Sequence, residues 1–318
     1  MRLRLFGALA LSTLLVGCPR TPDDTGSTDT GSHDTGSTDT STTDTGTTDT
    51  GTTDTSTDTG TTDTGTTGTD CYTLPSGLPP FGGSIDPSLI TNTPYDSVAT
   101  GLADLVTAAT NATPDDGTVV ALDTPIDVSG AYVTSTGYIP SAATYEVNFW
   151  LADKNSAIYV RLSGAGYDVK AGDQVDFTAS AVANYNGTPQ VSTITSLTVT
   201  SYNNDVYVRE STGATLTSDD FFWVHHIYGE IISDGTACGG SNYCFGFRHG
   251  GPSGPVETFR SYNGSNPTSA PIWVNGDCVE IYAPLDQYHD APQLNMQNSP
   301  SQSSELAWTR WFGNANGR

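Results

Sequence analysis

The feature that most constrains this chain is an internal repeat, because one segment of about twenty residues returns 103 to 104 positions later. Both copies open with Gly-Asp-x-Val, at residues 172–175 and 276–279. Both then alternate polar and apolar residues and close on Tyr-x-x-x-Pro-Gln and an aliphatic residue, at 185–191 and 288–294. Alternation is typical of a half-buried strand, and self-similarity at a fixed offset indicates a repeated structural unit. The sequence therefore predicts two copies of one small β module.

Most of the chain after Cys71 shows similar short alternating segments, separated by Gly, Asn, Asp and Ser. Many short strands with evenly spaced turns predict an all-β sandwich or barrel, and a closed barrel leaves no exposed strand edge. One short helix is expected before the first module, with Asp96 as its N-cap. Its apolar residues recur at helical spacing: Val98, Leu102, Leu105 and Val106.

The order of motifs in the first module resembles the OB-fold modules of secreted bacterial nucleases and surface lipoproteins. A first strand with the central Gly130 is followed by a Phe-x-x-x-Asp strand at 149–153, a short partner strand, Gly-Asp-x-Val and a Tyr-x-Gly-x-x-Gln hairpin at 185–190. The resemblance covers residues 118–200 and implies, together with the repeat, two OB-like small β-barrels in series. The second module departs from the pattern at 244–248, where Cys-Phe-Gly-Phe-Arg replaces the Phe-x-x-x-Asp strand. The resemblance therefore leaves the ligand surface of the second module in doubt.

These observations divide the chain into five expected parts. They are a lipoprotein signal peptide (1–17), an acylated Cys with a disordered Thr/Asp/Gly/Ser tether (18–70), an irregular lead-in segment with the short helix (71–117), a first OB-like module (118–210) and a second, divergent OB-like module (211–318).

The N-terminus has the pattern of a targeting signal. Arg2 and Arg4 precede an apolar run from Leu5 to Val16, as in a secretory signal peptide, and the run is too short to cross a hydrocarbon core about 30 Å thick as a helix. The run ends Leu-Val-Gly-Cys, which resembles the bacterial lipobox and implies acylation of Cys18, palmitate included. The lipid bilayer is then a partner through Cys18, and the protein is expected in the cell envelope, facing the periplasm or the exterior. An ordinary cleaved signal peptide with an unmodified Cys is the alternative.

The excess of acidic over basic residues affects which classes of partner the chain is expected to bind. Residues 19–70 are almost wholly Thr, Asp, Gly and Ser and predict a disordered, extended tether. This tether holds 11 of the 35 acidic residues, so residues 71–318 carry 24 acidic against eight basic residues, a formal charge of −16. The eight basic residues form no stripe in the sequence, and a surface of this charge repels phosphates. Nucleic acid is therefore not expected as a partner, and a glycan or a protein is preferred.

The cysteine count predicts disulfide bonds. Once Cys18 is assigned to lipidation, an even set remains in an oxidising compartment: Cys71, Cys238, Cys244 and Cys278. We favour the pairs Cys238–Cys244 and Cys71–Cys278, although three pairings are open. A thiolate metal site is not expected, because no Cys-x-x-Cys or His spacing matches one.

No catalytic constellation, metal site or cofactor motif is recognised, and the chain is not expected to be an enzyme. His225 and His226 are adjacent on a strand, so their side chains point to opposite faces, and we expect one buried and one exposed imidazole. Ser253 lacks the strand-to-helix setting of a nucleophile elbow. The acidic pairs at 115–116 and 219–220 lie in turns, where capping of backbone N–H groups is expected and Ca²⁺ binding is the alternative.

Three aromatic residues of the first module, Trp150, Tyr159 and Tyr185, are candidate ligand-stacking residues, because aromatic faces stack on sugar rings and unpaired bases. The alternative is that they fill the barrel. Two functions follow: a membrane-anchored lipoprotein with a noncatalytic binding or scaffolding role toward a glycan, protein or envelope partner, or an accessory or divergent hydrolase of the nuclease-associated OB type. Titratable groups converging in a cleft would favour the second.

Overall fold

The structure is a computed structural model that describes residues 68–78, 85–140, 145–162, 167–238, 242–262, 273–288, 291–296 and 308–317. The described residues belong to one compact unit. The signal peptide, Cys18 and nearly all of the tether lie outside the described residues, so the expectations about them stay predictions.

The described chain contains one α-helix and two sets of long strands. The helix and the first set are α1 (Leu102–Thr110), β2 (Val120–Pro140), β3 (Tyr145–Ala152), β4 (Ala157–Leu162), β5 (Gln174–Tyr185) and β6 (Thr188–Ser201). The second set is β9 (Val224–Ile231), β11 (Asn242–His249), β12 (Val256–Tyr262), β13 (Asp277–Tyr288) and β14 (Ala291–Met296). Around them lie β1 (Ile90–Thr91), β7 (Val206–Tyr207), β8 (Arg209–Glu210), β10 (Thr236–Ala237), β15 (Trp308–Asn314) and the 3-10 turns at Pro87–Leu89 and Ser218–Asp220.

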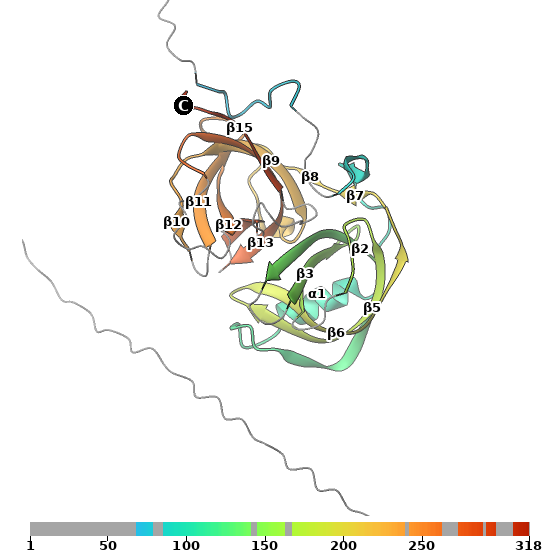
Figure 1. The fold of residues 1–318 in the computed structure, drawn as a ribbon. Helices are drawn as coiled ribbons and strands as arrows, with labels where there is room; N and C mark the ends of the chain where they lie inside the picture. The colour runs from blue at the N-terminus through green and yellow to red at the C-terminus, as the bar shows by residue number, and fades with distance from the viewer. Residues whose placement is uncertain are drawn as a thin grey trace, which may run out of the picture. The chain divides into compact units, whose positions relative to one another are not determined.

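The first set closes into a barrel in the order β2-β3-β4-β6-β5, drawn in green and yellow in Figure 1. β4 and β6 pair in parallel, with Tyr159 opposite Gln190, and the other neighbours are antiparallel. The ring closes because β2 pairs with β5 over residues 120–132 and with β3 over residues 132–140. Gly130 lies at a register shift of β2 with φ of 82°, a conformation that glycine adopts at no steric cost.

The second set closes in the same order. β11 pairs with β9 and β12, β12 pairs in parallel with β14, and β13 pairs with β14 and β9. β8 extends this sheet beside β9, and β15 pairs with β13. The prediction of an all-β fold with two five-stranded barrels in series and one helix before the first is confirmed (Figure 1).

The repeated Gly-Asp turn occupies the same place in both barrels. Gly172 and Gly276 have φ of 90° and 93°. Each glycine N–H donates to a carbonyl oxygen of the first strand of its own barrel, at 2.9 Å in the first and 2.7 Å in the second. The carboxylates of Asp173 and Asp277 each accept the backbone N–H three residues earlier, at 2.8 and 2.9 Å. The repeat is therefore a turn that fixes where the fourth strand of each barrel begins.

The hairpin that ends each repeat also follows from its sequence. Tyr185 pairs with Thr188 across Asn186 and Gly187, whose φ angles of 51° and 86° are those of a type I′ turn. In the second barrel Tyr288 pairs with Ala291 in the equivalent position.

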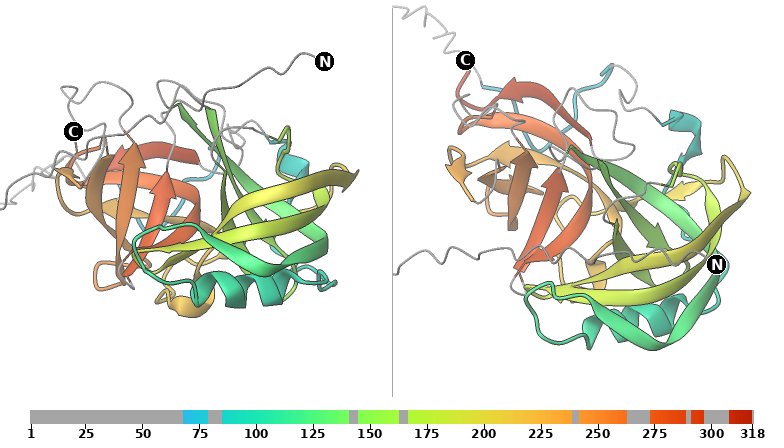
Figure 2. Two further views of the ribbon diagram at one scale, coloured as in Figure 1. Left: turned by 90° about the horizontal axis from the view of Figure 1, so that it is seen from below. Right: turned by 60° about the horizontal axis from the view of Figure 1, so that its bottom comes forward.

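The helix begins five residues later than predicted. Thr100 forms an antiparallel bridge with Ser129 of β2, which holds the residues around it extended. Gly101, with φ of 75°, is consequently the N-cap in place of Asp96. α1 lies beneath the strands of the first barrel in the left view of Figure 2, and its buried residues belong to that barrel's core: Leu102, Leu105 and Ala109.

Both favoured disulfide bonds are present in the structure, Cys71–Cys278 and Cys238–Cys244. Two disulfides indicate an oxidising, extracytoplasmic environment. Cys71–Cys278 joins residues 207 positions apart and fixes the lead-in segment beside the second Gly-Asp turn, where Thr69 N–H donates to the Asn314 carbonyl at 2.9 Å.

Candidate binding site

The structure separates the three candidate stacking residues. Trp150 and Tyr159 are buried, with 0% and 4% of their surfaces exposed, whereas Tyr185 is 43% exposed. The rings of Trp150 and Tyr159 face one another on neighbouring strands, with centroids 4.9 Å apart. They point away from the barrel core and pack in a second cluster with Phe222 and Trp223.

The residues that cover this aromatic pair come from the segment before β9. Phe222 has φ of 68°, which is unusual for a bulky residue, and its N–H donates to the Leu285 carbonyl at 2.6 Å. Trp150 Nε1 donates to Asp286 Oδ1 of β13 at 3.0 Å. The surface formed by the second and third strands of the first barrel is therefore occupied by the chain's own aromatic residues.

A cleft with a volume of about 760 Å³ opens beside this covered surface. It is lined by the aromatic residues of the 221–223 segment, by amide and hydroxyl side chains that include those of the β3–β4 and β5–β6 hairpins and of β13, and by charged residues: Asp115, Lys154, Arg209 and Asp219. The amide residues are Asn155, Asn184 and Gln287. Aromatic residues with a few polar groups around them are typical of small-molecule and sugar sites.

Arg209 of β8 is held at the edge of this cleft. Its guanidinium lies 4.3 Å from the ring centroid of Trp223 and donates from Nη1 to Asp220 Oδ1 at 2.7 Å. Asp220 also forms a capping box with Thr217. The guanidinium is thus oriented by a ring and a carboxylate, and of the acidic pair at 219–220 it is Asp220 that acts in capping.

Sequence reasoning missed most of this cleft. Its residues come from segments up to 181 positions apart, from Val106 to Gln287, and they carry no common motif. The aromatic run at 221–223 is the one signal that could have drawn attention to it.

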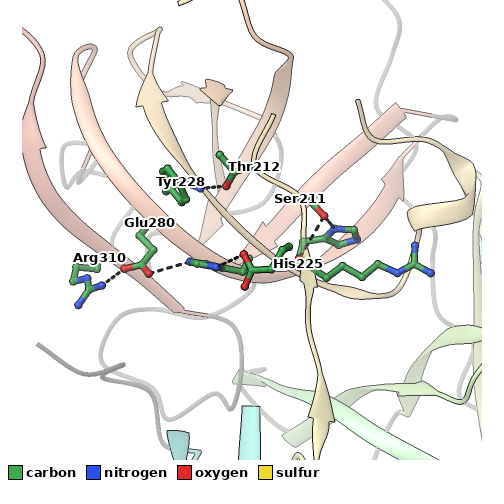
Figure 3. Close-up of polar contacts among 9 residues, drawn as sticks. Ser211, Thr212, His225, Tyr228, Glu280 and Arg310 are labelled. Carbon is green, nitrogen blue, oxygen red and sulfur yellow. Dashed lines mark hydrogen bonds and ion pairs between the residues drawn. The ribbon is translucent and has the colours of Figure 1, made fainter. Parts of the chain in front are cut away.

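His225 and His226 are both buried, so the expectation that one is exposed is wrong. His225 lies on the inward face of β9, and its Nε2 donates to the Asp220 carbonyl at 2.9 Å, which leaves Nδ1 to accept the Ser211 hydroxyl at 2.8 Å (Figure 3). Burial lowers the pKa of His225 to about 4 and keeps it neutral. Ser211 is 6% exposed and lines none of the described cavities, so this Ser–His pair holds β8 to β9 and is not positioned for nucleophilic catalysis.

His226 lies on the outward face, within a row of alternating charges across four strands. Nδ1 lies 2.8 Å from Glu210 of β8 and Nε2 lies 3.0 Å from Glu280 of β13, which in turn pairs with Arg310 of β15 (Figure 3). Tyr282 stacks on the imidazole at a centroid distance of 4.2 Å. The side chains of Glu210, Glu280 and Tyr282 contact the imidazole, which is the physical reason for its burial.

The charge of His226 is fixed by these partners. Burial opposes its protonation, but the hydrogen bonds and charges of Glu210 and Glu280 outweigh burial and raise the pKa to about 9 from 6.5. A raised folded-state pKa means that this network stabilises the fold fully below about pH 6.5 and that the contribution is lost as the pH rises through about 9. The cluster is therefore structural at neutral pH.

The inward face of the second barrel carries two further titratable groups. His249 lies two positions after the core residue Phe247, and Glu257 lies opposite Phe247 on β12. Burial lowers the pKa of His249 to about 4 and raises the pKa of Glu257 to about 7. His249 Nδ1 accepts the Gly213 N–H at 2.8 Å. Neither residue lines a described cavity, so these two buried groups do not take part in the cleft.

The remaining sequence expectations concern metals and membranes. Among the described residues no group of three or more His, Cys, Asp or Glu side chains is arranged to hold a metal ion. In the same part of the chain, no helix is long and apolar enough to span a membrane. His289 lies outside the described residues.

No protein-family profile and no curated protein matches this chain, whereas several solved structures do. One is the tetrameric p202 HIN2, with 11% identity, a TM-score of 0.31 and coverage of 63% of this chain and 97% of that chain. A second is the Ifi202 HINa domain in complex with 20bp dsDNA, with 10% identity, a TM-score of 0.28 and coverage of 62% and 98%. A third is a murine DNA-binding protein bound to double-stranded DNA, with 11% identity, a TM-score of 0.28 and coverage of 59% and 98%.

These comparisons contradict the expectation that nucleic acid is an unlikely partner, because two of the three matched chains are bound to double-stranded DNA. The physical reason is that net charge averages over a whole surface, whereas a ligand meets the local field of one face. A formal charge of −16 over residues 71–318 therefore does not exclude a class of ligand. Because the TM-scores are near 0.3, these matches do not show what this chain binds.

Proposed function

We propose that this protein is a lipid-anchored, noncatalytic binding protein of the cell envelope that holds a glycan in the cleft beside the first barrel. The observation that carries this proposal is the lining of the cleft, which combines aromatic residues with amide, hydroxyl and charged groups. Sugar rings offer hydroxyl groups that both donate and accept hydrogen bonds, and apolar C–H faces that pack on aromatic rings.

The titratable groups support binding over catalysis. The buried Ser211–His225 pair lines none of the described cavities. The charged residues that line the cleft are Asp115, Lys154, Arg209 and Asp219, of which Asp115 accepts the Gly187 N–H and Arg209 pairs with Asp220. General acid–base chemistry needs a group within hydrogen-bond reach of a bound substrate. The alternative of a divergent hydrolase is therefore not favoured.

The anchor rests on the sequence of residues 15–18. We expect a Cys18→Ala variant to lose labelling by a palmitate analogue and to leave the membrane fraction, because Cys18 is the acylated residue of the lipobox-like motif. Fractionation of cells that express the wild-type and variant chains measures this. A variant that is still labelled and still sediments with membranes would show that the anchor lies elsewhere.

Glycan binding is tested with the full chain in detergent micelles and three probes: chitohexaose, cellohexaose and xylohexaose. We expect at least one probe to bind in isothermal titration calorimetry, and we expect Asn155→Trp, which fills the cleft, to weaken that binding by about tenfold or more.

The matched control is Thr198→Trp, an exposed position of β6 that lines none of the described cavities. This variant should bind as the wild type does. The proposal is overturned if none of the three probes binds, or if Asn155→Trp binds as tightly as Thr198→Trp.

A further inference from the structure

We propose that the glycan surface continues past the cleft into a second subsite, in which Tyr185 stacks on a pyranose ring. This inference rests on the proposed function and extends it. The β5–β6 hairpin contributes residues to two cavities. Asn184 and Gly187 line the cleft, whereas Tyr185 and Gln190 line a separate groove of about 320 Å³.

The ring of Tyr185 is held in place by the loop before β2. A Cβ atom on Gly117 would lie 2.8 Å from Tyr185 Cδ2, so the ring lies against the bare glycine backbone. Asp116 forms an antiparallel bridge with Tyr185, and Gly117 N–H donates to the Asn184 carbonyl at 2.8 Å. A ring fixed from one side loses little conformational entropy when a ligand covers the other.

The hairpin turn itself is fixed by the same loop. Asp115 Oδ1 accepts the Gly187 N–H at 2.9 Å, beside the type I′ turn of Asn186 and Gly187. Both walls of the groove are therefore positioned by backbone hydrogen bonds and do not depend on long flexible side chains.

Polar groups surround the Tyr185 ring. The groove is lined by the carboxylate residue Asp116, the amide residue Gln190, the hydroxyl residue Ser192 and the guanidinium residue Arg161. Gln190 is 5% exposed. A ligand that supplies both donors and acceptors matches this mixed set of polar groups.

The combination favours a sugar. A carboxylate and an amide oxygen accept hydrogen bonds from neighbouring hydroxyls, a guanidinium and an amide NH₂ donate to them, and the aromatic ring packs on the C–H face. Since the cleft and the groove flank one hairpin, the structure assigns them a linear oligosaccharide of more than one ring.

The test uses the full chain in detergent micelles, the three hexasaccharides as probes and isothermal titration calorimetry. We expect Tyr185→Ala to weaken binding of the bound probe by about tenfold or more, and Tyr185→Phe to keep most of the affinity because the ring remains. Tyr202→Ala is the matched control: this tyrosine of the same barrel is 68% exposed and lies outside the groove, and its loss should change the affinity less than about twofold.

The outcomes separate this inference from the proposed function. If the wild type binds and Asn155→Trp weakens binding but Tyr185→Ala does not, the groove is not a subsite and the cleft proposal stands. If no probe binds, both proposals fall. If a double-stranded DNA oligonucleotide binds and Tyr185→Ala weakens that binding while no hexasaccharide binds, the groove is a nucleic-acid site and the glycan assignment is overturned.

Discussion

Removal of the Cys71–Cys278 disulfide, in a Cys71→Ala/Cys278→Ala variant, should lower the free energy of unfolding by about 5 kcal/mol. The reason is the separation of 207 residues between the two cysteines, since a cross-link that closes a long loop removes the most freedom from the unfolded chain. Both cysteines are also buried, and the bond holds the lead-in segment against the turn at Gly276. Urea unfolding of the full chain without reductant measures the change.

The second disulfide supplies the control. Cys238 and Cys244 are only six positions apart, so a Cys238→Ala/Cys244→Ala variant should lose about 2 kcal/mol in the same measurement. The ranking of the two double variants is the decisive quantity. If the short-loop variant loses as much stability as the long-loop variant, loop closure is not the source of the effect.

The second large effect is expected at Trp150. Trp150→Ala should cost about 3–5 kcal/mol, because the indole is fully buried among Tyr159, Phe222 and Trp223 and its removal leaves a cavity. The same urea titration reports the loss, and near-ultraviolet circular dichroism shows whether the neighbouring aromatic rings lose their fixed packing.

Trp150→Phe separates packing from hydrogen bonding. Phenylalanine keeps an aromatic ring against Tyr159 but removes the 3.0 Å bond to Asp286, so a smaller cost of about 1–3 kcal/mol is expected. Equal costs for the two variants would show that the bond to Asp286, and not the aromatic cluster, accounts for the effect of Trp150.

The turn chemistry of both barrels was predictable because it is local. Gly172 and Gly276 must adopt positive φ, and the carboxylate that follows each of them bonds to a backbone N–H three residues away. The 186–187 turn likewise needs only its own two residues. Interactions between residues this close in sequence produce a recognisable motif, and the repetition of that motif predicted two barrels.

The helix start shows where local reasoning stops. Asp96 is a good N-cap by residue type, but Thr100 pairs with Ser129, 29 positions later, and this bridge moves the start to Leu102. The residues around Asp96 do not indicate that a strand distant in sequence pairs with them, so the start of the helix could not be predicted from that segment alone.

The sequence by itself determined the class of fold, the repeated module and an even set of cysteines, because alternation, turns and counts are properties of short stretches. Only the tertiary structure decided that Trp150 is covered while Tyr185 is exposed, and that His225 and His226 are both buried. Each of those outcomes depends on partners brought from elsewhere in the chain, such as Asp286 for Trp150 and Glu280 for His226. The local sequence around an aromatic residue or a histidine does not indicate which distant segment covers it. Burial, and therefore the choice of binding surface, is decided by the packing of segments that are far apart in the chain.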